Sequence, residues 1–181
     1  MPLNANALTD LASTKSYLDI DTTDTSKDSI IEFLINAASE AIEKYCRRKM
    51  KQATYTDEEY DGTGSQNLYL KQYPISSITS IKIDDVVVAA TEYKTRKESG
   101  IVVRMNAMWD KGILNLKVTY QAGYAAIPSD VELACKHLVK FYFKTEIADF
   151  STTFGEGFVM RPEDWPRQVK ALLSPHRKVL I

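Results

Sequence analysis

Three lysines of one predicted helix are the residues of this chain best placed to act together. Lys136, Lys140 and Lys144 recur every four residues, so a helix places them in a single file on one face. We name these three residues the lysine file. Such a file of ammonium groups can bind the phosphates of a polyanion such as DNA. It can equally be an ordinary solvated face, and the spacing alone does not decide between the two.

A second basic cluster lies at the end of an earlier predicted helix. Cations at that end complement the negative pole of the helix dipole, and they could also contact an acidic partner surface. Neither basic cluster is interleaved with aromatic residues in the way of a platform for single-stranded nucleic acid. The second cluster consists of Arg47, Arg48, Lys49 and Lys51.

The residue types that usually carry catalysis occur here outside catalytic patterns. The two histidines, His137 and His176, are far apart in the sequence. Cys46 and Cys135 fall among apolar neighbours, which is typical of packed, reduced thiols. Nucleophile-elbow, phosphate-loop and metalloprotease motifs are absent, and no cysteine or histidine pair has metal-ligand spacing. The sequence therefore predicts no catalytic residue, no metal and no cofactor, so we expect the chain not to be an enzyme.

An acidic run is the remaining candidate for chemistry. Asp57, Glu58 and Glu59 are consecutive, and Asp61 is close by, so together they could imitate a cation site or serve a hydrolase. Consecutive residues of a strand point to opposite faces, however. A solvated, charged strand edge is therefore the favoured interpretation.

Composition and charge set limits on the class of protein. The 181 residues suffice for one medium domain, and a hydrophobic fraction of 44% predicts a real core. The net charge of −1 means that contact with nucleic acid would depend on local patches. No apolar run approaches the roughly 18 residues of a membrane span, and we expect no secretory signal and a cytoplasmic origin.

Hydrophobic spacing predicts an α+β fold. Long helices are expected near residues 26–49 and 129–147, with Thr25 or Ser26 capping the first of them. Short helices are expected at 8–18, with Thr9 as a possible cap, and at 166–173. From Ala53 to Tyr124 the period changes to two, which predicts about six short strands. Turns are expected at Asp84-Asp85 and at Ser99-Gly100.

These elements predict a helical body with a small antiparallel β domain inserted in it. The body would comprise residues 1–50 and 125–150, and the β domain residues 51–124. Residues 151–181 would form an extended C-terminal arm that ends in a short helix.

The helix near 129–147 is apolar over an unusually wide arc. Leu133, Phe141 and Phe143 lie outside its main apolar stripe. Such a helix is either central in its own core or packed against another subunit. We therefore take these three residues, together with Arg47 and Arg48, as a candidate subunit interface.

Six segments, in a fairly specific order and spacing, resemble a known family. They resemble the head–tail connector (adaptor) proteins of long-tailed double-stranded DNA phages and prophages, and the likeness covers about residues 8–178. The segments are LINAASEAIEKYCRR (34–48), YDGTG (60–64), LYLKQYPISSI (68–78), the stretch 109–124, IPSDVELAC (127–135) and VKALLSPHR (169–177).

This resemblance implies a structural virion protein at the head–tail interface, made in the cytoplasm of a bacterial host. It implies a ring, typically of twelve copies, that lies beneath the portal, extends the DNA channel and docks the next connector or tail protein. The partners would be other copies of the chain, the portal protein, a tail-side connector or stopper, and passing double-stranded DNA bound without sequence specificity. No membrane is implied, and the lysine file would line the DNA channel.

The resemblance also implies that the C-terminal arm docks on the portal or on a neighbouring subunit. Two other interpretations of the chain remain open: a DNA-binding module, and a head-completion or stopper protein one layer further from the portal. The candidate docking residues are Phe150, Phe154, Phe158, Trp165, Leu172, Leu173 and Arg177.

Overall fold

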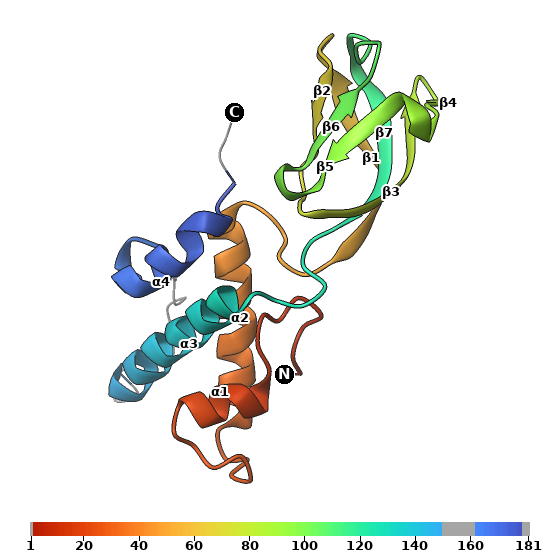
Figure 1. Cartoon of the computed structure of the whole chain (residues 1–181). Coiled ribbons are helices and arrows are strands. Elements are labelled where there is room, and N and C mark those ends of the chain that lie inside the picture. Colours follow the sequence, from red (N-terminus) through yellow and green to blue (C-terminus); the bar gives the residue numbers. More distant parts are fainter. Residues whose placement is uncertain (1, 150–161, 179–181) are drawn as a thin grey trace. The chain divides into compact units, whose positions relative to one another are not determined.

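The computed structural model describes residues 2–149 and 162–178, and it confirms the α+β class. The chain divides into two compact units (Figure 1). The helical unit comprises Met1–Met50 and Ile127–Ile181, and the β unit comprises Lys51–Ala126. The helical unit holds α1 (Leu11–Tyr17), α2 (Asp28–Cys46), α3 (Ser129–Asp149) and α4 (Arg167–Leu173).

The helical unit is built around α2 and α3. These two helices pack against each other, α1 packs on α2, and α4 packs on α3. Ile31, Leu34 and Ile42 of α2 are buried, as are Leu138 and Val139 of α3, at the helical spacing that the sequence indicates. No helix of the described residues is long and apolar enough to cross a membrane.

Two predicted helix caps were wrong. α1 begins at Leu11, and its cap is Asp10, whose Oδ1 accepts from the amide of Ser13 at 2.8 Å, rather than Thr9. α2 begins at Asp28 after Lys27, not after Thr25 or Ser26. The Ser26 amide instead donates to Asp24 Oδ1 at 2.9 Å. Asp24 thus folds this stretch into a local turn that competes with the helix start.

The β unit consists of two antiparallel sheets. One has the order β1-β7-β3-β4 and the other β2-β6-β5. The predicted hairpin is confirmed, because β3 pairs with β4 around Asp84 and Asp85, whose φ angles are 47° and 64°. The strands are β1 (Ala53–Gly62), β2 (Asn67–Tyr69), β3 (Ile75–Ile83), β4 (Val86–Val87), β5 (Tyr93–Arg96), β6 (Ile101–Arg104) and β7 (Gly112–Ala122).

β7 is the central strand of the larger sheet and pairs with β1 on one side and β3 on the other. Alternate residues of β7 are buried, as its period of two predicts. Trp109, in the loop before β7, is fully buried in the same core as Tyr60 and Tyr120. The core of the β unit also includes residues of the smaller sheet, such as Leu68 and Val102, so the two sheets share it.

Gly123, at the exit of β7, allows a close backbone approach that no other residue would permit. Its φ is 106°, and a Cβ here would lie 2.5 Å from the carbonyl oxygen of Lys51. We expect Gly123→Ala to lower the free energy of unfolding by about 3 kcal/mol, the sum of backbone strain and overpacking. Urea unfolding followed by tryptophan fluorescence measures this change.

The control is Gly64→Ala. Gly64 also has a positive φ, 73°, but a Cβ added here would meet Lys111 Cβ at an ordinary contact distance of 3.8 Å. This variant should cost only the strain of the left-handed conformation, about 1 kcal/mol. Equal losses for the two variants would show that close approach at Gly123 is not the constraint.

Candidate functional site

The lysine file on α3 is already engaged with other side chains along most of its length. Lys136 Nζ forms an ion pair with Glu132 Oε1 at 2.7 Å. Lys140 Nζ lies 5.1 Å from the centroid of the Tyr17 ring, in cation–π contact. Lys144 is exposed. The file is therefore not a uniform stripe of solvated cations, and its role in a DNA channel stays a prediction.

Tyr17 joins α1 to the polar face of α3. Its hydroxyl lies 3.0 Å from His137 Nδ1, and the two rings meet edge to face. Lys140 lies over the same ring, so Tyr17 contacts both His137 and Lys140 of α3. His137 is thus a structural residue that helps to fix α1 on α3.

The candidate interface residues are divided between the surface and the interior. Leu133 and Arg47 are exposed, and Phe141 is half-buried. Arg48 and Phe143 are buried within the helical unit, which differs from the prediction of a surface role. Their burial has local causes, since Lys27 Nζ lies over the ring of Phe143 and Arg48 lies beside the C-terminal segment.

The described part of the C-terminal segment, residues 162–178, folds back on the helical unit of its own chain instead of extending away. Trp165 and Leu173 are buried, and Leu172 is half-buried. The ring of Tyr45, near the end of α2, is 5.3 Å from the Trp165 ring and 5.1 Å from the Arg177 guanidinium.

Two of the predicted docking anchors, Trp165 and Leu173, are therefore core residues here, because α3 and α2 offer apolar surface that covers them. The other predicted anchors, Phe150, Phe154 and Phe158, lie outside the described residues.

An aspartate–histidine clip fastens the end of this segment. His176 Nε2 lies 2.7 Å from Asp130 Oδ2 at the start of α3, and its Nδ1 lies 3.5 Å from an Arg48 nitrogen. Partial burial acts to raise the pKa of Asp130, but the hydrogen bond and charge of His176, helped by the Val131 amide, outweigh it and lower that pKa. The backbone amide of Lys178 also donates to the Cys46 carbonyl at 2.9 Å.

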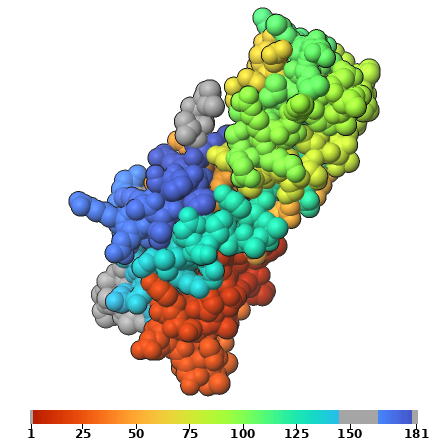
Figure 2. Space-filling model, in the orientation of Figure 1, coloured from red at the N-terminus to blue at the C-terminus, as the bar shows by residue number. Residues whose placement is uncertain are grey.

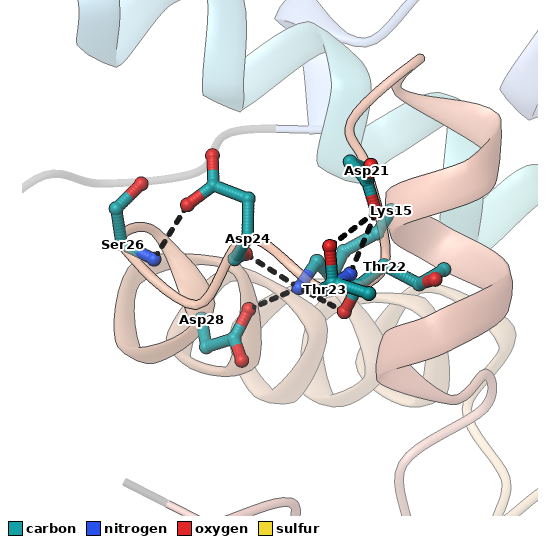
Figure 3. A network of polar contacts seen from close by, with 7 residues as sticks. All are labelled: Lys15, Asp21, Thr22, Thr23, Asp24, Ser26 and Asp28. Atoms are coloured by element: carbon teal, nitrogen blue, oxygen red, sulfur yellow. Dashed lines mark hydrogen bonds and ion pairs between the residues drawn. The ribbon is translucent and has the colours of Figure 1, made fainter.

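A buried lysine, which sequence reasoning missed, holds the loop between α1 and α2. Lys15 Nζ donates to the carbonyls of Thr22 at 3.0 Å and Asp24 at 2.7 Å, and it pairs with Asp28 Oδ1 at 2.7 Å (Figure 3). The loop also bonds to itself, since Asp21 accepts from the amide of Thr23. The available signal was a lysine on a short helix followed by a loop rich in Asp, Ser and Thr.

The acidic run of β1 contains no catalytic arrangement. Glu58 Oε2 accepts from the Tyr120 hydroxyl at 2.6 Å and from the Tyr60 hydroxyl. Burial, followed by these hydrogen bonds to Glu58, raises the pKa of both tyrosines. Asp57 instead pairs with Lys82 at 3.1 Å. Glu58 is thus committed to fixing Tyr60 and Tyr120 rather than to holding a cation.

The two cysteines and the remaining acidic residues are further candidates for reactive or metal-binding groups in the part of the chain that the structure describes. Cys46 and Cys135 are free and buried, as predicted, and burial raises the pKa of their thiols to about 11 and about 12. These cysteines therefore stay protonated and unreactive at neutral pH. Among residues 2–149 and 162–178, no group of three or more His, Cys, Asp or Glu side chains could hold a metal ion.

A family model and several solved structures match the chain. The family model described as head completion protein matches residues 7–179. Among curated proteins, none matches the chain. A chain in the neck of an empty gene transfer agent (GTA) particle, computed with C6 symmetry, has a TM-score of 0.63 and 18% identity, and the match covers 100% of this chain and 97% of that one.

Two further solved structures agree. A chain of the virion of the native GTA particle has a TM-score of 0.61 and 17% identity, with 100% of this chain and 94% of that one covered. A chain in the neck of the native particle, computed with C12 symmetry, has a TM-score of 0.59 and 18% identity, with 100% and 97% covered. At these identities the similarity establishes a shared fold.

The Lys15 network should contribute strongly to the stability of the helical unit. Lys15→Met would leave two carbonyls and the Asp28 carboxylate without their cation, so we expect the free energy of unfolding to fall by about 3 kcal/mol. Chemical denaturation measures the loss. The control, Lys44→Met, removes an exposed ion pair with Glu40 and should cost less than about 0.5 kcal/mol. Similar losses in both variants would contradict the assigned role of Lys15.

The contact between Asp130 and His176 should make the free energy of unfolding depend on pH in the acidic range. Because the folded-state pKa of Asp130 lies below 3.8, its contribution is complete above that pH and is lost as pH falls through the lowered value. We therefore expect Asp130→Asn to be less stable than the wild type at pH 5, with the difference shrinking as the pH is lowered below 3.8. Unfolding curves at several pH values test this, and a difference independent of pH would contradict it.

Proposed function

This chain belongs to the head completion protein family, and we propose from that membership that it works in the neck, where the head and tail of a phage-like particle join. It is a structural protein rather than an enzyme. The family description favours the head-completion alternative over the portal-adjacent adaptor that was our main expectation. We therefore assign the chain to head completion, with docking to the next neck protein as its task.

The single observation that carries this proposal is the family match over nearly the whole described chain. The fold adds support, since the similar solved chains belong to GTA necks and a GTA virion. The symmetries of those necks, C6 and C12, are both compatible with a ring of twelve copies, which we propose for this chain. Its partners are then other copies, a portal-side protein and a tail-side protein.

The geometry of the chain suits a mechanical part. Charged groups such as Lys15, Glu58 and Asp130 serve as internal fasteners, so they stabilise the two units without performing chemistry. Exposed apolar residues on the helices, Phe33 and Leu133, are available for contact between copies. A net charge of −1 suits a ring that passes DNA without gripping it, because each phosphate contact adds affinity.

A separate role as a DNA-binding module has weaker support. Two of the three lysines in the lysine file already contact Glu132 and Tyr17, so the file offers little free cationic surface. In the neck, we place the lysine file toward passing DNA, with Lys144 as its exposed member.

The proposal predicts that this chain completes heads that lack it. Purified chain is added to DNA-filled heads assembled without it, and separately purified tails follow. We expect a ring of the chain at one vertex of each head, seen by electron microscopy, and restored joining of tails. The control is the same mixture with the chain omitted. Failure of the wild-type chain to bind heads and to restore joining would contradict the proposed function.

A further inference from the structure

Several large apolar side chains are exposed in β4, in the loop before β7 and at the start of β7. Ile113 is 87% exposed, Val86 71% and Leu114 52%. Soluble proteins seldom expose several large apolar side chains together unless a partner covers them. We name this patch the apolar tip; it consists of Val86, Val87, Met108, Ile113 and Leu114.

Hydrogen bonds bring the segments of the apolar tip together. The amide of Asp84, in the turn before Val86, donates to the carbonyl of Asn115 in β7 at 2.9 Å. The Asn115 side chain donates to the carbonyl of Asp110 at 3.0 Å and so ties down the loop that contains Met108. Figure 1 shows the loops after β1 and before β7 at the same end of the β unit, and the segment near residue 110 is exposed there in Figure 2.

The backbone at Leu114 is held in a conformation that exposes two neighbours at once. Consecutive residues of a strand normally point to opposite faces, yet Ile113 and Leu114 are both exposed. Leu114 has a φ of 51°, which is uncommon for a bulky residue, and its amide donates to Asp61 Oδ1 at 2.7 Å. Strain of this kind is retained where the surrounding structure enforces it, and it often marks functional sites.

Acidic residues surround the apolar tip. Asp61 is bonded to Leu114, Asp84 is in the turn before Val86, and Asp110 is in the loop before Ile113. Asp85 is paired with Lys117, whose Nζ is 2.7 Å away, and Arg104, which donates to the Met108 carbonyl, is paired with Glu92 at 3.3 Å. In these described turns and loops, Lys111 is then the one further cation beside the three carboxylates. An acidic rim repels DNA and anionic lipid, and it favours a protein surface with a basic rim.

The exposed apolar residues on the described helices of a second copy do not provide such a surface. On α3, the exposed Leu133 is flanked by Glu132 and Lys136, which form an ion pair with each other. The exposed apolar residues of α2, Ile30 and Phe33, lie beside Asp28 and Glu32. Contact between two apolar tips, or between a tip and this part of α2, would place carboxylates against carboxylates, which is unfavourable. The charge pattern therefore points to a different protein chain.

We infer that the apolar tip docks into an apolar socket, rimmed by lysine and arginine, on a different protein of the neck. This inference rests on the proposed function for its setting. The two exposed residues of β7 and the valines of β4 fill the socket, and the surrounding aspartates pair with its basic rim. The apolar residues supply the contact area, and the charges select the partner.

The test uses the double variant Ile113→Ser, Leu114→Gly. Glycine accepts a positive φ without strain, so this variant should fold at least as stably as the wild type by thermal unfolding. Its self-assembly, measured by mass photometry, should be unchanged. In the mixture of heads lacking the chain, purified chain and purified tails, we expect at least a tenfold drop in joined particles, because joining requires every contact of the neck.

A second variant tests the charges. Asp84→Asn, Asp110→Lys removes one rim charge and reverses another, and asparagine tolerates the positive φ of Asp84. The apolar residues are kept, so the joining of heads to tails should again fall at least tenfold. The matched control is Tyr69→Ser in β2, which removes a 47% exposed aromatic side chain from the other sheet. This variant should leave the joining of tails to heads unchanged.

Three results would overturn the inference. The first is normal joining with the Ile113→Ser, Leu114→Gly variant. The second is loss of self-assembly in that variant, which would make a second copy the occupant. The third is an equal loss with Tyr69→Ser. Failure of the wild-type chain itself to bind heads would count against the proposed function instead.

Discussion

Burial of α3 on more than one side is the constraint on which the helical unit depends. This helix packs against both α2 and α4, so apolar residues around much of its circumference leave water. The wide apolar arc of its sequence therefore has a cause within the chain itself. Because α4 supplies one of the two covering surfaces, the C-terminal segment is part of the core and not an appendage to it.

The fastening of that segment follows from the same arrangement. Trp165 and Leu173 bury apolar surface, while His176 and the amide of Lys178 make polar contacts with Asp130 and Cys46. The apolar contacts supply most of the favourable free energy, and the polar contacts fix the position of the segment. These contacts join residues that are far apart in the sequence.

Periodicity predicted the elements of this fold well, because it reflects local geometry. The two long helices, the β7 strand and the Asp84-Asp85 turn all follow from spacing and turn chemistry in adjacent residues. Helix caps were less predictable, since Asp24 could bond either to a helix or to its own turn. The burial of Phe143 and Trp165 depends on long-range packing, and no pattern within their own segments indicates it.

The candidate sites were harder to predict for a related reason. The spacing of Lys136, Lys140 and Lys144 correctly indicates one helix face, but it contains no information on Tyr17, which comes from another helix. Likewise, the acidic run in β1 does not reveal that Glu58 meets two tyrosines in the β unit. Charged residues were easy to find in the sequence, whereas their partners required the structure.

The ammonium group of Lys15 has a consequence for the conditions under which the chain keeps its shape. Two carbonyl oxygens and a carboxylate converge on this group, an arrangement of oxygen atoms that resembles the surroundings of a bound ion. Here the positive charge is covalently attached to α1, so it cannot be washed out, chelated or exchanged. The contacts of Lys15 therefore hold the α1–α2 loop through a charge that belongs to the chain itself.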